Sequence, residues 1–94
     1  MIRELTKNQK RHVREKVKEV ISGATETWKA PEEHYPLMAL NAAILEIDGV
    51  EEVDRDTNGW AWDYWQYYSF EGKQFTLSGS GYHGGHAFYE REQP

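Results

Sequence analysis

The sequence predicts an α+β fold in which two N-terminal helices pack on one face of a four-stranded antiparallel β-meander, in the order ααββββ. Three observations lead to this prediction. Apolar residues recur at helical spacing up to Gly49, they alternate at strand spacing after Val50, and three turn signals divide the second half. The 94 residues suit a single domain, with a helical half (1–49), a meander (50–91) and a short tail (92–94).

The first helix is expected between Thr6, a suitable N-cap, and Gly23, a suitable stop. One apolar stripe at helical spacing is expected to be buried: Val13, Val17, Val20, Ile21 and Ala24. A second stripe with the same period is basic: Lys7, Arg11, Arg14 and Lys18.

The segment 24–34 is expected to be a connector, and the second helix is expected to follow Pro36. The residues after Pro36 are apolar on most sides of a helix, which predicts the central element of the core. Gly49 is expected to end this helix, because glycine readily adopts the left-handed conformation found beyond helix C-termini.

Three tight turns are expected in the meander, at Asn58-Gly59, Glu71-Gly72 and Gly84-Gly85. They give strands at roughly 51–57, 60–70, 73–83 and 86–91. If each turn is a two-residue loop, Asp54 lies opposite Asp63, Tyr64 lies opposite Gly79, and Trp62 lies opposite Gly81. Glycines at these positions leave room for the two large rings.

This register separates the side chains of the meander into two faces, because successive side chains of a strand point to opposite sides. The core face is expected to carry Val53, Trp60, Trp62, Tyr64, Tyr68, Phe70, Phe75, Leu77 and Phe88. The opposite face is expected to carry Glu52, Asp54, Asp56, Asp63, Trp65, Tyr67, Thr76, Ser78, Ser80, Tyr82 and Tyr89.

The composition excludes several classes of protein. Without cysteine the chain has no disulfide and no Cys-ligated zinc, and no apolar stretch is long enough to span a membrane. The N-terminus is too charged for a signal peptide, so we expect a cytoplasmic protein that does not contact membranes.

The charge is unevenly distributed along the chain. Residues 1–19 hold seven Lys or Arg against three Glu, whereas residues 20–94 hold four Lys or Arg against thirteen Asp or Glu. We therefore expect a weak homodimer. Its copies would associate either through opposite charges or through the edge of the last strand.

The acidic and aromatic face predicts a recognition surface, because aromatic anchors ringed by polar groups are typical of protein interfaces. Its expected partner is a protein with a basic surface. The residues expected to bind that partner are Glu52, Asp54, Asp56, Asp63, Trp65, Tyr67 and Tyr82.

Metal or ligand binding is an alternative. Asp54, Asp56 and Asn58 have the spacing of calcium ligands before a glycine, and Asp63 could complete that set across the hairpin. However, Trp65 stands at the twelfth position, where a calcium loop needs an acid. His83 and His86 flank the Gly84-Gly85 turn and could bind zinc, although a zinc site needs further ligands.

A second alternative is nucleic-acid binding through the basic stripe of the first helix, which the acidic remainder of the chain disfavours. No motif indicates an enzyme or a cofactor, and none identifies a family. In size and composition the chain is similar to the small, acidic, cysteine-free proteins of phages and other mobile elements, many of which bind and block a host protein. The sequence therefore predicts a non-enzymatic inhibitor or adaptor.

Overall fold

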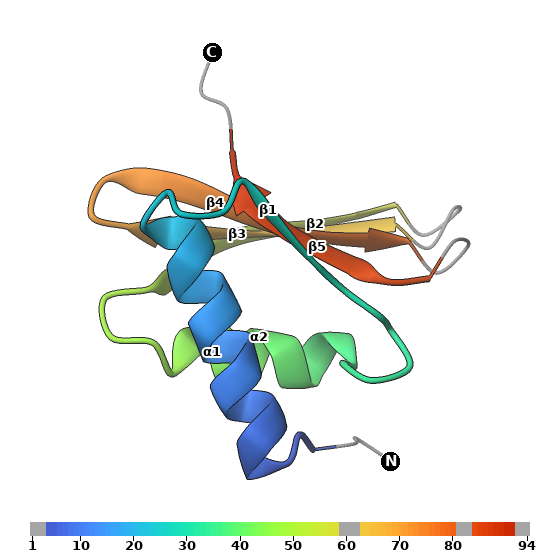
Figure 1. The fold of residues 1–94 in the computed structure, drawn as a ribbon. Helices are drawn as coiled ribbons and strands as arrows, with labels where there is room; N and C mark the ends of the chain where they lie inside the picture. The colour runs from blue at the N-terminus through green and yellow to red at the C-terminus, as the bar shows by residue number, and fades with distance from the viewer. Residues whose placement is uncertain (1–3, 59–62, 81–83, 92–94) are drawn as a thin grey trace.

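The computed structural model describes residues 4–58, 63–80 and 84–91. They form an α+β fold of two helices and a five-stranded antiparallel sheet, with the strand order β1-β5-β4-β3-β2. Both helices lie against one face of the sheet, and no described element covers the other face (Figure 1). The predicted fold class is confirmed, although the sheet has one strand more than expected.

Helix α1 (Lys7–Ile21) begins where the sequence predicts. The Thr6 side chain accepts a hydrogen bond from the Gln9 backbone, and the Gln9 side chain accepts one from the Thr6 backbone. Val13, Val17, Val20 and Ile21 are buried as expected. Ala24 is exposed instead, because the helix ends at Ile21 and the chain has already turned away.

Helix α2 (Leu37–Leu45) follows Pro36 as expected but ends before Gly49. Two short-range backbone bonds, from Ile47 to Ile44 and from Val50 to Ile47, replace its last turn. The helix buries Leu40, Ala43 and Ile44, while Met38 on its outer side is 62% exposed. Neither described helix is both long and apolar enough to cross a membrane.

Strand β1 (Thr27–Ala30) lies within the segment expected to be a connector. It pairs with β5 (His86–Glu90), placing Trp28 opposite Phe88 and burying both. Because β5 therefore has a neighbour on each side, the prediction that the last strand is a free edge is wrong. Dimerisation by pairing at that edge is excluded with it.

The hairpin of β3 (Asp63–Phe70) and β4 (Lys73–Ser80) confirms the predicted register. Phe70 lies opposite Lys73, and Glu71 and Gly72 both have positive φ, at 47° and 80°. This conformation is the one that a two-residue type I′ turn requires. Tyr64 lies opposite Gly79, as the arithmetic predicts.

The registers predicted for the other two hairpins are wrong, by four positions in the pairs next to each turn. Asn58, the last residue of β2 (Glu51–Asn58), pairs with Asp63, and Gly79 pairs with His86. Both connections are longer than two residues. Asn58, which was expected in the first turn, belongs to β2 and pairs with Asp63. In the other connection, the Gly84 amide donates a hydrogen bond to the Ser80 carbonyl.

A four-position shift keeps the alternation of faces, since side chains repeat every two residues. Four predicted core residues of the sheet are accordingly fully buried: Tyr68, Phe75, Leu77 and Phe88. Phe70 packs at the margin of the core and Tyr64 is half-buried. The predictions for Trp60, Trp62, Gly81, Tyr82 and His83 lie outside the described residues.

Val53 departs from the predicted core face and is 51% exposed. The pairing of β2 with β3 shifts between Glu52 and Asp54, so Val53 is the extra residue of a β-bulge. Such a bulge reverses the alternation along a strand. Glu52, opposite the buried Tyr68, faces the helices, whereas Asp54, opposite Tyr67, faces away from them.

Candidate functional site

The candidate site is the sheet face that the helices leave uncovered, which we call the outer face (Figure 1). Residues directly opposite each other on antiparallel strands share a face, so the register determines its members. On β2 and β3 they include Asp54, Asp56, Asp63, Trp65 and Tyr67, and on β4, β5 and β1 they include Thr76, Ser78, Ser80, Ala87, Tyr89, Thr27 and Lys29.

The acids of the outer face lie beside its aromatic residues. Asp54 is directly opposite Tyr67, and Asp56 is directly opposite Trp65. The predicted contact between Asp54 and Asp63 is wrong, because Asp63 pairs with Asn58. Asp54 and Asp63 therefore do not repel each other as a direct pair. Asp54 and Asp56 lie on the edge strand β2, and Asp63 lies at the start of β3.

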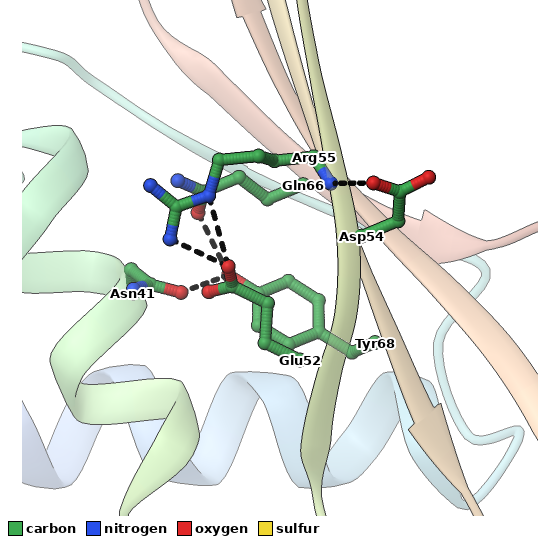
Figure 2. A network of polar contacts seen from close by, with 6 residues as sticks. All are labelled: Asn41, Glu52, Asp54, Arg55, Gln66 and Tyr68. Atoms are coloured by element: carbon green, nitrogen blue, oxygen red, sulfur yellow. Dashed lines mark hydrogen bonds and ion pairs between the residues drawn. The ribbon is translucent and has the colours of Figure 1, made fainter.

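No cation of the described residues neutralises the three aspartates. Asp54, Asp56 and Asp63 form no ion pair among the described residues, and Asp54 accepts a hydrogen bond only from the neighbouring Arg55 amide, at 2.8 Å. Figure 2 shows Asp54 on one side of β2 and the Arg55 side chain on the other. The acidic side of the outer face therefore remains available to an external cation.

Glu52 does not belong to this surface, which corrects the prediction. It lies on the helix side of β2, where its Oε1 accepts hydrogen bonds from Arg55 Nη2 at 2.6 Å and Nε at 3.0 Å (Figure 2). This carboxylate raises the pKa of Arg55 through the hydrogen bond and its charge. The bulge at Val53, which no sequence motif indicates, is the physical reason for the reversal.

Tyr68 connects the inner side of the sheet to α2. Its hydroxyl lies 2.7 Å from Asn41 Oδ1 and 2.9 Å from Gln66 Oε1 (Figure 2). Burial, with a smaller contribution from the Glu52 carboxylate, raises the pKa of Tyr68 far above its ordinary value, so the hydroxyl stays protonated. The contact with Asn41 joins β3 to α2 on the inner face of the sheet, whereas the contact with Gln66 lies within β3.

The outer face is hollowed next to its aromatic residues. An open depression of about 500 Å³ is lined by Trp65, Tyr67, Thr76, Tyr89, Glu26, Glu90, Thr27 and Arg91. Thr76 lies between Tyr67 and Tyr89 on adjacent strands and is only 2% exposed, whereas the three aromatic rings are half-buried. The guanidinium of Arg91 lies 4.5 Å from the centre of the Tyr67 ring.

The alternative metal sites lack the expected geometry. Asp54 and Asn58 are four residues apart on one extended strand, which separates them by about 13 Å, too far to surround one ion. His86 pairs with Gly79, and the predicted contact of His86 with His83 lies outside the described residues. Among the described residues, no three His, Asp or Glu side chains are grouped closely enough to hold a metal ion.

His86 instead faces the helices, where it is 5% exposed and 5.6 Å from the Tyr64 ring, centre to centre. Within the described parts of the chain, the two ring nitrogens of His86 and the Tyr64 hydroxyl have no hydrogen-bond partner of good geometry. Burial lowers the pKa of His86, while the Glu32 carboxylate and the nearby Tyr35 backbone act in the opposite direction. The neutral ring is therefore favoured in the folded protein.

The basic stripe of α1 is partly neutralised. Arg14 pairs with Glu46 at 3.2 Å, and Lys10 on a neighbouring position lies 3.9 Å from the same carboxylate. Lys7, Arg11 and Lys18 are exposed. This stripe and the outer face lie on different sides of the molecule, because α1 packs against the inner face of the sheet (Figure 1).

Comparison of the chain with protein-family models, with curated proteins and with solved structures finds no match.

Proposed function

We propose that this protein is a non-enzymatic binding module, acting as an inhibitor or adaptor, that docks its outer face on a basic surface of a partner protein. The observation that carries the proposal is the placement of Trp65 and Tyr67. Both rings are half-buried on a sheet face that no described element covers, and each lies directly opposite an aspartate, Asp56 or Asp54, that forms no ion pair among the described residues.

The preference of aromatic residues for strands would be enough to explain why Trp65 and Tyr67 lie on this face. It does not explain the aspartates, because Asp is disfavoured in strands. The bulge at Val53 turns Asp54 and Asp56 toward the aromatic residues rather than toward the helices. This arrangement supports a surface that combines aromatic anchors, which supply binding energy, with charges that steer a basic partner and select for it.

A non-enzymatic role is supported by the separation of the groups that catalysis would need to combine. Ser78 is on the outer face, whereas His86, the buried histidine of the sheet, faces the helices. A histidine on the opposite face cannot accept the proton of that hydroxyl, since a general base must lie within hydrogen-bond reach.

The test is affinity capture from the native host's lysate, with the full chain as bait and three matched variants. Trp65→Ala removes an anchor, the double variant Asp54→Asn with Asp56→Asn removes charge, and Arg11→Gln on α1 is the control. We expect one protein to be captured by the unmodified chain and by Arg11→Gln, and to be lost with the two outer-face variants.

The captured protein is then purified and titrated into the chain by calorimetry in 0.1 M and 1 M salt. We expect weaker binding at high salt, because the Debye length falls from about 10 Å to about 3 Å. Capture that persists with both outer-face variants would overturn the proposal.

Loss of capture with Arg11→Gln alone, together with a salt-sensitive gel shift, would favour nucleic-acid binding through α1. Calorimetry with calcium and zinc tests the metal alternative. Saturable binding that Asp54→Asn or His86→Leu abolishes would favour it over the proposed function.

A further inference from the structure

The depression on the outer face has the chemistry of a cation site. Tyr67, Trp65 and Tyr89 supply aromatic rings, and the faces of such rings attract cations through their quadrupole. Asp54 lies directly opposite Tyr67, and Glu26 and Glu90 border the depression. Both the rings and the surrounding charges therefore favour a positive group.

The floor of the depression provides a hydrogen-bonding group. Thr76 is 2% exposed and lies between the two tyrosines. Within the described part of the chain its hydroxyl makes no hydrogen bond. This hydroxyl is not one of the fully buried polar atoms that lack a partner, so it keeps contact with solvent and can accept a hydrogen bond from a polar group of a ligand.

The protein itself seats a cation there. The Arg91 guanidinium lies over the Tyr67 ring, 4.5 Å from its centre. Arg91 forms no ion pair among the described residues, its side chain is exposed, and it is anchored through its backbone amide, which bonds to the Gln74 carbonyl at 2.9 Å. Its side chain can therefore leave the ring without disturbing the strand.

We propose that the depression is the binding site for an arginine side chain of the partner, and that Arg91 occupies the Tyr67 ring until that arginine displaces it. This inference rests on the proposed function for the existence of a partner. An incoming guanidinium stacks on Tyr67, approaches the Asp54 carboxylate, and donates a hydrogen bond to the Thr76 hydroxyl. Arginine is favoured because its flat, weakly hydrated head combines stacking with several donors.

The probe is N-acetyl-arginine amide, titrated into the isotopically labelled full chain and followed by NMR. N-acetyl-citrulline amide is the control, because it has nearly the same shape without the charge. We expect saturable shifts at the amides of Tyr67, Thr76 and Tyr89 with the arginine probe, and none with citrulline.

Three variants make the experiment decisive. Arg91→Ala removes the internal competitor and is expected to tighten probe binding by about two- to fivefold, the factor that one exposed cation–π contact represents. Tyr67→Leu is expected to abolish the shifts, and Asp54→Asn to weaken binding in low salt but not in 1 M salt. Amide signals away from the depression that match those of the unmodified chain will show that each variant is folded.

Absence of shifts at these amides in both the unmodified chain and Arg91→Ala would overturn the inference, as would equal shifts with citrulline. Either result would leave the proposed function standing if the outer-face variants still lose the captured partner. Conversely, probe binding without any captured partner would support the arginine site and refute the docking function.

Discussion

Truncating Trp65 and Phe88 to alanine separates the outer face from the core. Phe88 is fully buried, with its ring stacked on Phe75 at 5.7 Å and tilted against Tyr68 at 6.0 Å. Cutting a buried Phe to Ala costs about 3–5 kcal/mol of stability. A domain of this size has roughly 5–14 kcal/mol in total, so Phe88→Ala should remove a large part of its stability.

Trp65 is half-buried on a face that no described element covers. Full burial of a large apolar side chain contributes about 1.5–3 kcal/mol, so a half-buried ring should contribute about 1 kcal/mol. With a denaturant slope of about 1.5 kcal/mol per molar urea, Trp65→Ala should lower the unfolding midpoint by about 0.7 M and Phe88→Ala by about 2–3 M.

The assay is urea unfolding followed by far-UV circular dichroism, which does not depend on the fluorescence of the tryptophan removed. The Trp65→Ala variant should stay folded but should no longer bind the captured partner. A midpoint shift for Trp65→Ala as large as that for Phe88→Ala would refute the assignment of the outer face.

Three further predictions concern the inner side of the sheet. Tyr68→Phe removes a buried hydroxyl from its two amide partners and should cost about 1–2 kcal/mol, a fall of roughly 4–16 °C in Tm by calorimetry. Burial lowers the pKa of His86 from 6.5, so the unfolded chain binds the proton more readily than the folded protein. Stability should therefore fall as the pH drops below 6.5. In urea titrations between about pH 4 and about pH 8, His86→Leu should reduce this dependence of stability on pH. Gly79→Ala places a methyl group in the Tyr64 ring and should cost about 1–3 kcal/mol, whereas the same change made together with Tyr64→Ala should add almost nothing to the cost of Tyr64→Ala alone.

Features that depend on neighbours in sequence could be predicted. The bonds between Thr6 and Gln9 close within one helical turn, and the Glu71-Gly72 turn needs only its own backbone angles. The core face of the sheet was also predictable, because alternation survived register errors of four positions, an even number.

Features that depend on distant partners could not be predicted. Strand β1 has only four residues, and it is a strand because β5, almost sixty positions later, pairs with it. The bulge at Val53 arises from the pairing of β2 with β3 and carries no turn or glycine signal. For this reason Asp54, Asp56, Asp63, Trp65 and Tyr67 were placed correctly on the outer face, whereas Glu52 was not.

The bulge at Val53 also determines how β2 tolerates changes in its length. Deleting this one residue would leave Glu52 opposite Tyr68 and Asp54 opposite Tyr67, as they are now, because consecutive residues of a regular strand point to opposite faces. A substitution at Val53 that keeps the bulge would leave both faces unchanged, since the side chain is half-exposed and has no pairing partner. The acidity of the outer face thus does not depend on the presence of Val53, and β2 can lose this residue or exchange its side chain without exchanging its two faces.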